Sequence, residues 1–181
     1  MKLCCFTGHR KIPTVDLPTV QKRLQKTIKQ LMKQDITTFY CGGALGFDTL
    51  AAQAVLKARR FHPRVKLILA LPCRDQAEHW READRLLYES IKRRADEVIY
   101  LAERYTRGCM FERNRYMVDH SDVCVCYCLR SRRHGIYGAV CAAQGRSDHQ
   151  SGKGGMGRKN PLTECQGKTI VMFGFDGATA L

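Results

Sequence analysis

Short apolar runs alternate with amphipathic segments along the first 128 residues of the chain. Runs of four to seven residues, rich in β-branched, aromatic and cysteine side chains, predict buried strands at 3–6, 36–41, 65–71, 97–101 and 123–128. Between these runs, apolar residues recur at three- and four-residue steps, which predicts helices. We expect these helices at about 17–32, 49–59, 80–91 and 110–120.

Strands and helices thus follow one another in strict alternation. This order predicts an α/β fold, a Rossmann-like three-layer sandwich with a mainly parallel sheet. In the helix near 80–91, the predicted buried stripe consists of Trp80, Ala83, Leu87 and Ile91.

The pattern decays after the fifth strand. Residues 144–167 are rich in Gly, Ser, Lys, Arg and Asn, which predicts a loop or a disordered segment. Residues 168–175 are a candidate sixth strand. We therefore expect one domain over residues 1–143 and an irregular tail over residues 144–181.

Composition limits the class of protein. The chain has 181 residues and is 44% hydrophobic, enough for one domain with a substantial core. No apolar stretch approaches the roughly 18 residues of a membrane span, and the N-terminus lacks the apolar region of a secretory signal. We therefore expect a cytoplasmic protein with no membrane partner. Seven of the ten cysteines lie in or at the ends of predicted strands and are interpreted as small buried hydrophobes in a reducing compartment, without a metal: Cys4, Cys5, Cys41, Cys73, Cys124, Cys126 and Cys128.

The net charge of +14 predicts an anionic partner without identifying it. Five basic residues occupy the polar face of the first predicted helix: Lys22, Arg23, Lys26, Lys29 and Lys33. A solvated face is the favoured interpretation, and attraction of nucleic acid is the main alternative.

The junction between the second strand and its helix carries the strongest chemical signal. It reads Gly42-Gly43-Ala44-Leu45-Gly46-Phe47-Asp48. Glycines allow a sharp turn and a close approach of backbone to ligand, and the first N–H groups of a helix attract an anion. We therefore expect Gly42, Gly43, Ala44 and Gly46 to hold a phosphate, and Gly43→Val to block binding while the fold survives.

The first strand ends in a similar way, with Thr7, Gly8, His9 and Arg10. The carboxyl ends of neighbouring parallel strands share one edge of a sheet, which is where open α/β sheets bind ligands. We expect all four residues to contribute to the site. Arg10 has the fork geometry for a phosphate clamp, whereas for His9 a ligand contact and packing under the loop are equally favoured.

With these segments in place, the chain resembles the SLOG superfamily, and within it the YpsA-like subgroup. The resemblance rests on Thr7 to Arg10, on Gly42 to Asp48, on Leu71-Pro72-Cys73 with Gln76 and Trp80, and on Phe111 to Val118 before Ser121-Asp122. It covers residues 1–143 and implies a nucleotide or nucleotide-derived ligand at the glycine loop. The superfamily includes the DNA-processing protein DprA (Smf) and the LOG cytokinin-activating enzymes.

One motif departs from this pattern. Relatives carry a Gly-Gly-Thr turn after the fifth strand, whereas this chain reads Arg133-His134-Gly135-Ile136. Gly135 stays a candidate contact, but the threonine hydroxyl that could bond a phosphate is absent.

Further polar candidates lie on the two helices. Asp48 is a helix cap or an acceptor for ribose hydroxyls. Arg113 is expected to contact the ligand. Asn114 is expected to share the inward face of its helix with Met110, Phe111, Met117 and Val118, where its amide either ties the neighbouring loop together or contacts the ligand, two roles that are equally favoured. Glu112 is favoured as a solvated carboxylate over a general acid or base.

Three functions follow from these residues. The leading one is a sensor or regulatory protein that binds a nucleotide or nucleotide-derived ligand, because no nucleophile, base or metal constellation is evident and no resident cofactor is predicted. The first alternative is LOG-like hydrolysis of an N-glycosidic bond in a nucleotide. The second is DprA-like binding of single-stranded DNA, motivated by the net charge. A homo-oligomer is left open.

Overall fold

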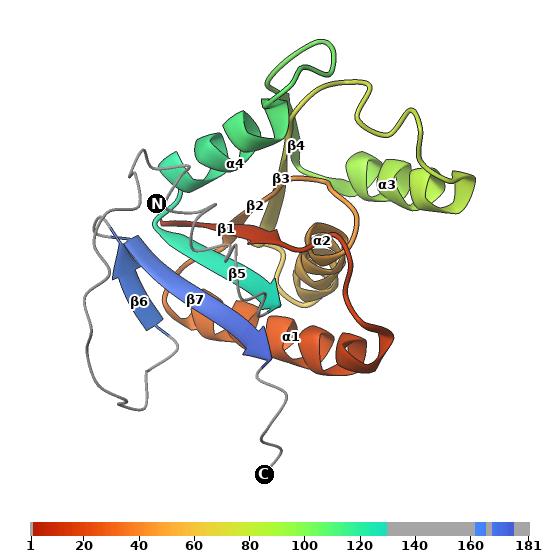
Figure 1. Cartoon of the computed structure of the whole chain (residues 1–181). Helices are drawn as coiled ribbons and strands as arrows, with labels where there is room; N and C mark the ends of the chain where they lie inside the picture. Colours follow the sequence, from red (N-terminus) through yellow and green to blue (C-terminus); the bar gives the residue numbers. More distant parts are fainter. Residues whose placement is uncertain (1, 130–161, 166–167, 176–181) are drawn as a thin grey trace, which may run out of the picture.

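The computed structural model describes residues 2–129, 162–165 and 168–175 (Figure 1). Its sheet has the strand order β4-β3-β2-β1-β5-β7-β6. The strands are β1 (Leu3–Gly8), β2 (Thr38–Cys41), β3 (Lys66–Leu71), β4 (Glu97–Tyr100), β5 (Val123–Leu129), β6 (Leu162–Cys165) and β7 (Lys168–Phe175). The first five and β7 are parallel, and β6 pairs antiparallel with β7. The predicted α/β class is confirmed.

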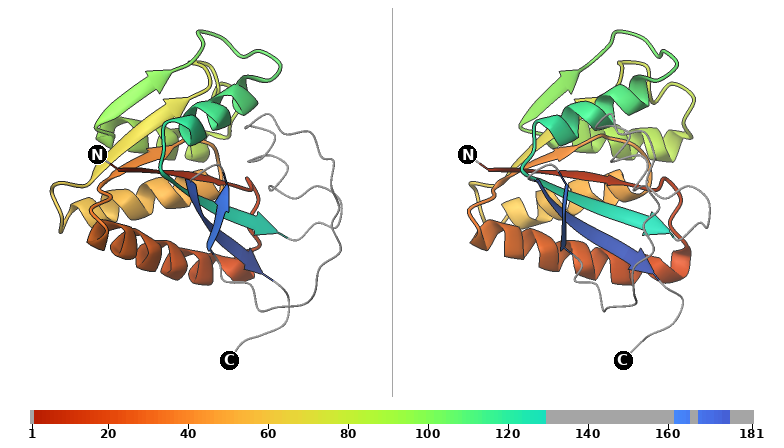
Figure 2. Two further views of the ribbon diagram at one scale, coloured as in Figure 1. Left: turned by 90° about the vertical axis from the view of Figure 1, so that its left-hand side faces the viewer. Right: turned by 60° about the vertical axis from the view of Figure 1, so that its left-hand side comes forward.

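The helices are η1 (Thr14–Asp16), α1 (Leu17–Lys33), α2 (Phe47–Arg59), α3 (Glu82–Arg94) and α4 (Cys109–Asp119). In Figure 2, α4 lies on the opposite face of the sheet from α1 and α2. No helix of the described residues is long and apolar enough to cross a membrane.

Both faces of the sheet are covered, so its strands are apolar on both sides. In β1, Cys4 and Phe6 pack toward α1 and α2, whereas Cys5 packs toward Met117 and Val118 of α4. The alternation of side chains along a strand thus divides one apolar run between two cores. This is the three-layer arrangement that the sequence predicted.

The cysteines of β5 follow the same rule. Cys124 and Cys126 are buried in the core under α4, with their sulfurs 3.4 Å apart. Their burial agrees with the packing interpretation. The side chain of Cys128 lies outside the described residues.

Two expectations were wrong. Residues 162–165, assigned to a loop or disordered segment, form β6, because their backbone pairs with β7 although they lack a helical or long apolar pattern. The buried face of α3 was also misassigned: Tyr88 and Ile91 are buried, while Ala83 and Leu87 are exposed. The helix begins at Glu82, after Trp80, so the predicted stripe started one turn too early.

Candidate functional site

The loops that follow β1 and β2 lie together at the carboxyl edge of the sheet. These two strands are parallel neighbours, so their carboxyl ends are adjacent. The Phe47 N–H at the start of α2 donates to the carbonyl of His9, with 3.1 Å between nitrogen and oxygen. A backbone hydrogen bond therefore joins the two predicted motifs directly.

The loop needs glycine at these positions because of its backbone conformation and its close packing against the rest of the protein. Gly43 and Gly46 have φ of 65° and 81°, in the left-handed region that favours glycine. A Cβ on Gly46 would collide with the backbone of His9 and Arg10, and one on Gly43 would lie 2.5 Å from Cδ2 of Leu71. Gly8 is equally restricted, since its Cβ would lie 2.7 Å from the Phe47 ring.

This geometry corrects the expectation for Gly43→Val. The position of the missing side chain is directed into the protein, toward Leu71, Gln76 and Tyr88. A valine there would first disturb the packing of the loop. Loss of ligand binding in that variant could not be assigned to a blocked ligand position.

A buried ion pair supports the loop. Asp48 Oδ2 accepts hydrogen bonds from Arg113 Nη1, at 2.9 Å, and from the Ala44 N–H, at 3.3 Å. The two charged side chains are only 5% and 6% exposed. Gly42 leaves the space that the guanidinium occupies, because a Cβ on Gly42 would overlap it. The ion pair therefore links α2, α4 and the glycine loop.

The electrostatics of the pair follow from its burial. Desolvation raises the pKa of Asp48 above its ordinary value, while Arg113, the Ala44 N–H and Arg10 oppose the shift. Arg113 was expected to contact a ligand and Asp48 a ribose. The structure gives each of them a partner within the protein, so their contact with a ligand stays a prediction.

Arg10 differs from Arg113 in its exposure. Its side chain is exposed, and Nη2 lies 3.5 Å from the sulfur of Met110, a weak acceptor. His9 is half-buried, and its ring meets that of Tyr127 edge to face with 6.4 Å between centroids. Thr7 is half-buried at the end of β1. Arg10 is thus a cation at the carboxyl edge that can turn toward a bound anion.

Helix α4 is rotated relative to the expectation. Its buried residues are Cys109, Arg113, Met117 and Val118, whereas Phe111 is 41% exposed. Asn114 is half-buried beside Arg113, not fully inward. Glu112 is exposed, as expected for a solvated carboxylate. The error arose because Phe111 was assigned to the apolar face of the helix. Arg113, which was expected to contact a ligand, lies on the inward face and pairs with Asp48.

Gln76 and Tyr88 were not predicted as site residues. Gln76 Nε2 donates to the carbonyl of Gly43 at 3.1 Å. Gln76 Oε1 and Arg113 Nε are buried without a hydrogen-bond partner among the described residues. Burial raises the pKa of Tyr88, and the neighbouring Gln76 opposes that shift. Gln76 belongs to a motif quoted for the resemblance, whereas Tyr88 gave no signal because α3 was placed in the wrong rotation.

The structure therefore brings together the residues after β1, the glycine loop, Asp48 and Arg113, with Asn114 next to them on α4. Gly135 and the turn around it lie outside the described residues.

These features define a Rossmann-like α/β protein with a glycine-rich loop at the carboxyl edge of its sheet. A family model described as the YspA SLOG family (YpsA) matches residues 2–135. The chain belongs to this family, which confirms the resemblance drawn from its motifs.

Individual relatives agree with this assignment. The uncharacterized SPbeta prophage-derived protein YoqJ of Bacillus subtilis is 32% identical over 124 residues, 60% of this chain and 72% of YoqJ. A UPF0398 protein of Halalkalibacterium halodurans is 31% identical over 105 residues, 57% of this chain and 56% of that protein. The match thus spans little more than half of the second relative.

A solved structure shares the fold. DNA processing protein A from Helicobacter pylori, described for its single-stranded DNA binding mode, aligns with a TM-score of 0.54 and 19% identity. The alignment covers 79% of this chain and 60% of that one. At this identity the likeness concerns the fold.

Proposed function

We propose that the chain binds a nucleotide or nucleotide-derived ligand at the glycine loop and acts as a sensor or regulatory protein. The observation that carries this proposal is the pairing of two glycine turns at adjacent carboxyl ends of β1 and β2, joined by the hydrogen bond from Phe47 to His9. That position is where open α/β sheets bind ligands. The first turn of α2 adds backbone N–H groups and the positive end of a helix dipole.

The loop is also held in shape before any ligand arrives. The Asp48–Arg113 pair fixes it from one side, and the hydrogen bond from Gln76 to the Gly43 carbonyl fixes it from another. A site that does not reorganise loses less conformational entropy on binding. Arg10, exposed at the same edge, supplies a positive charge for a phosphate.

One buried polar atom near Gly43 is a candidate contact for the organic part of a ligand. Gln76 is 8% exposed, and its Oε1 has no hydrogen-bond partner among the described residues, whereas the hydroxyl of Tyr88 has Gln76 as a hydrogen-bonding neighbour. Such an atom commonly binds a ligand or an ordered water. Ribose hydroxyls or base edges have the donors to satisfy it.

Hydrolysis of an N-glycosidic bond is less well supported. A carboxylate would have to act as acid, base or nucleophile at the reacting bond. Asp48 is held by Arg113, and Glu112 is exposed on α4. We therefore place binding before catalysis.

The proposal is tested by titrating the full chain with AMP, ADP, NAD and ADP-ribose, and with inorganic phosphate and pyrophosphate, by calorimetry and thermal shift. A ligand that binds only the folded state at 100 times its Kd stabilises it by about 2.7 kcal/mol. We expect at least one nucleotide to bind more tightly than either inorganic anion.

Arg10→Gln is the site variant and Arg93→Gln the control, since Arg93 is an exposed cation in the last turn of α3, where the helix approaches the opposite edge of the sheet. Arg10→Gln should weaken binding about 10-fold, the effect of losing one charge-assisted hydrogen bond. Arg93→Gln should leave it unchanged. No binding by any nucleotide, or equal losses in both variants, would refute the proposal.

A further inference from the structure

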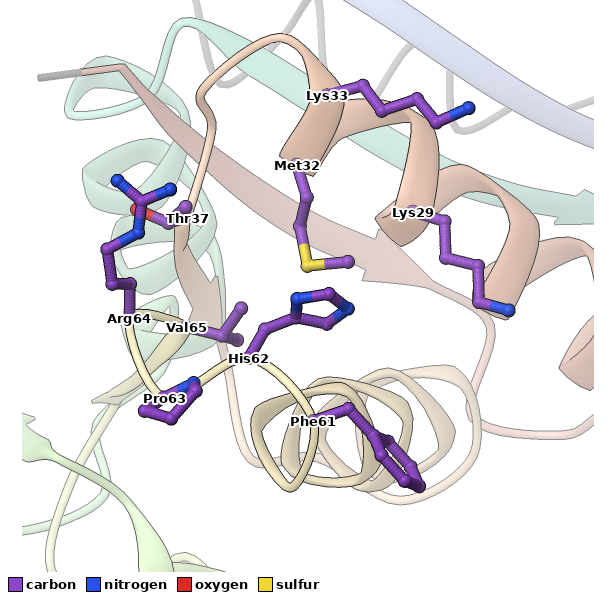
Figure 3. A pocket seen from close by; sticks show the side chains of 9 residues that line it. All are labelled: Lys29, Met32, Lys33, Thr37, Phe61, His62, Pro63, Arg64 and Val65. Atoms are coloured by element: carbon purple, nitrogen blue, oxygen red, sulfur yellow. The ribbon is translucent and has the colours of Figure 1, made fainter.

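A second surface lies at the amino edge of the sheet, away from the glycine loop. Residues 37 and 65 precede β2 and β3, and α1 and α2 end beside them. Two adjoining hollows of about 420 and 340 Å³ share Lys29, Met32, Phe61 and His62 (Figure 3). We call this surface the basic groove. Helix α2 has 13 residues, which separates the groove from the loop by roughly 20 Å.

Basic side chains outnumber acidic ones around the groove, where the exposed Asp35 follows α1 closely. Residues 17–34 and 49–66, which contain α1 and nearly all of α2, hold ten Lys and Arg and no Asp or Glu. Among the ten, Arg59 is paired with Asp96 of the loop before β4, at 2.6 Å, and Arg23 also has an interaction within the protein. Because α1 and α2 pack against each other, their charges add over one face.

The lysines of α1 form a row. Lys22, Lys26, Lys29 and Lys33 are exposed and recur at steps of three and four residues, on one side of the helix. At 1.5 Å per residue, the row spans about 16 Å. This length suits several consecutive phosphates of an extended strand, whereas a single phosphate would need one or two of these cations.

An exposed aromatic residue accompanies the charges. Phe61 is 74% exposed at the end of α2. In Figure 3, Met32 and His62 point toward the middle of the hollow, whereas Phe61 and Lys33 point away from it. An exposed aromatic ring beside a row of cations is the combination by which proteins bind unpaired bases and their phosphates.

We propose that the surface around the basic groove binds single-stranded nucleic acid, with the phosphates along the α1 lysines and one base stacked on Phe61, whose ring is exposed at the rim, outside the hollow. Charge alone would attract any polyanion, and Phe61 makes unpaired bases the fitting occupant. The lysine row is therefore more than a solvated face. This binding is independent of the glycine loop.

The test uses the full chain and a fluorescent 20-nucleotide oligo-dT, followed by anisotropy between 50 and 300 mM NaCl. Phe61→Ala should weaken binding about 5- to 150-fold, the effect of removing one stacking ring. Lys29→Gln with Lys33→Gln should lower the slope of log affinity against log salt by about 1.4, since each phosphate contact contributes about 0.7 for a single strand.

Matched controls lie on α3. Leu86 is 62% exposed, so Leu86→Ala removes a similar apolar surface elsewhere. Arg81→Gln with Arg85→Gln removes the same charge as the double lysine variant from exposed positions at the start of α3, away from the amino edge. Both controls should bind oligo-dT like the parent, and a duplex of the same length should bind the parent more weakly and be insensitive to Phe61→Ala.

Other results would overturn the proposal. Equal losses in the α3 controls would mean attraction by overall charge. Loss of binding in Arg10→Gln but not in Phe61→Ala would place the nucleic acid on the glycine loop. Binding to anionic vesicles without binding to oligo-dT would indicate a lipid surface. A self-association that Phe61→Ala abolishes, without oligo-dT binding, would assign the groove to a second copy.

Discussion

The two edges of the sheet differ in whether a basic side chain is buried and paired or exposed. At the carboxyl edge, Arg113 is buried and neutralised by Asp48, and it supports the glycine loop. Toward the amino edge, Lys29 and Lys33 of α1 are exposed, and residues 17–34 contain no Asp or Glu, although Asp35 follows directly. The first arrangement gives a fixed shape without a ligand, and the second gives a surface whose charges need a partner. A net charge of +14 does not distinguish them, because it counts both kinds of cation alike.

The largest effect is expected from Arg113→Ala. It leaves the Asp48 carboxylate buried with the Ala44 N–H as its hydrogen-bond donor, and breaking a buried pair from one side costs about 3–5 kcal/mol. The matched control is Arg115→Ala, whose pair with Asp119 spans 3.7 Å between side chains 60% and 51% exposed. That variant should lose at most about 1 kcal/mol in urea denaturation.

The same variant should have a distinctive pH dependence. Without Arg113, the native pKa of Asp48 rises further above its unfolded value, so the native state binds the proton more tightly. Stability is then greatest below the unfolded pKa and falls as pH rises through the native one. The difference from the parent should be smaller at pH 5 than at pH 8. A difference that does not change with pH would mean that the carboxylate is not the destabilised group.

Gly43→Val is expected to have the next largest effect. It combines a left-handed φ with a contact of 2.5 Å to Leu71, which together cost about 2–4 kcal/mol. Gly108→Ala is the control, because Gly108 also has a positive φ, 101°, but a Cβ there meets nothing within 4 Å. It should cost about 1–2 kcal/mol, the strain of the backbone alone. Equal losses would show that the loop is not packed as described.

The glycine loop and the Asp48–Arg113 ion pair show what the sequence could and could not predict. The strands and helices could be predicted because each apolar run is short and has clear ends. The glycine loop could be predicted because its residues are adjacent in sequence. The Asp48–Arg113 pair could not be predicted, since 65 residues separate its members and an arginine on a helix is usually exposed. Tyr88 was missed for a related reason: α3 has exposed leucines, Leu86 and Leu87, which obscure its buried face.

The next prediction concerns Arg59, a cation near the amino edge that is paired with Asp96. Asp96 Oδ2 accepts hydrogen bonds from Arg59 Nη1 and from the Leu67 N–H, at 2.6 and 2.8 Å. Asp96→Ala leaves the partly buried Leu67 N–H without this acceptor and should cost about 1–2 kcal/mol. Glu103→Ala, which breaks a pair with Arg74 between side chains 79% and 56% exposed, should cost about 0.5 kcal/mol or less. Equal losses on urea denaturation would mean that Asp96 contributes only through surface charge.

The smallest effect has the opposite sign. Lys29→Glu removes repulsion along the α1 row and places a glutamate four residues before Lys33, so it should stabilise the protein by about 0.5 kcal/mol at low salt. Lys29→Gln, which removes repulsion without adding attraction, should give about half of that gain, and 1 M NaCl should erase both. Thermal denaturation at 20 mM and 1 M NaCl measures these differences.

If the α1 lysine row serves only as a solvated face, Lys29→Glu makes the protein more stable and leaves its affinity for oligo-dT unchanged. If it binds nucleic acid, the same substitution makes the protein more stable and its affinity for oligo-dT lower, because the cations that a partner would neutralise repel one another when it is absent. A Lys29→Glu protein that is less stable than the parent at low salt would show that Lys29 is held by a favourable native contact, and the contrast between a self-neutralised edge and an uncompensated one would then fail.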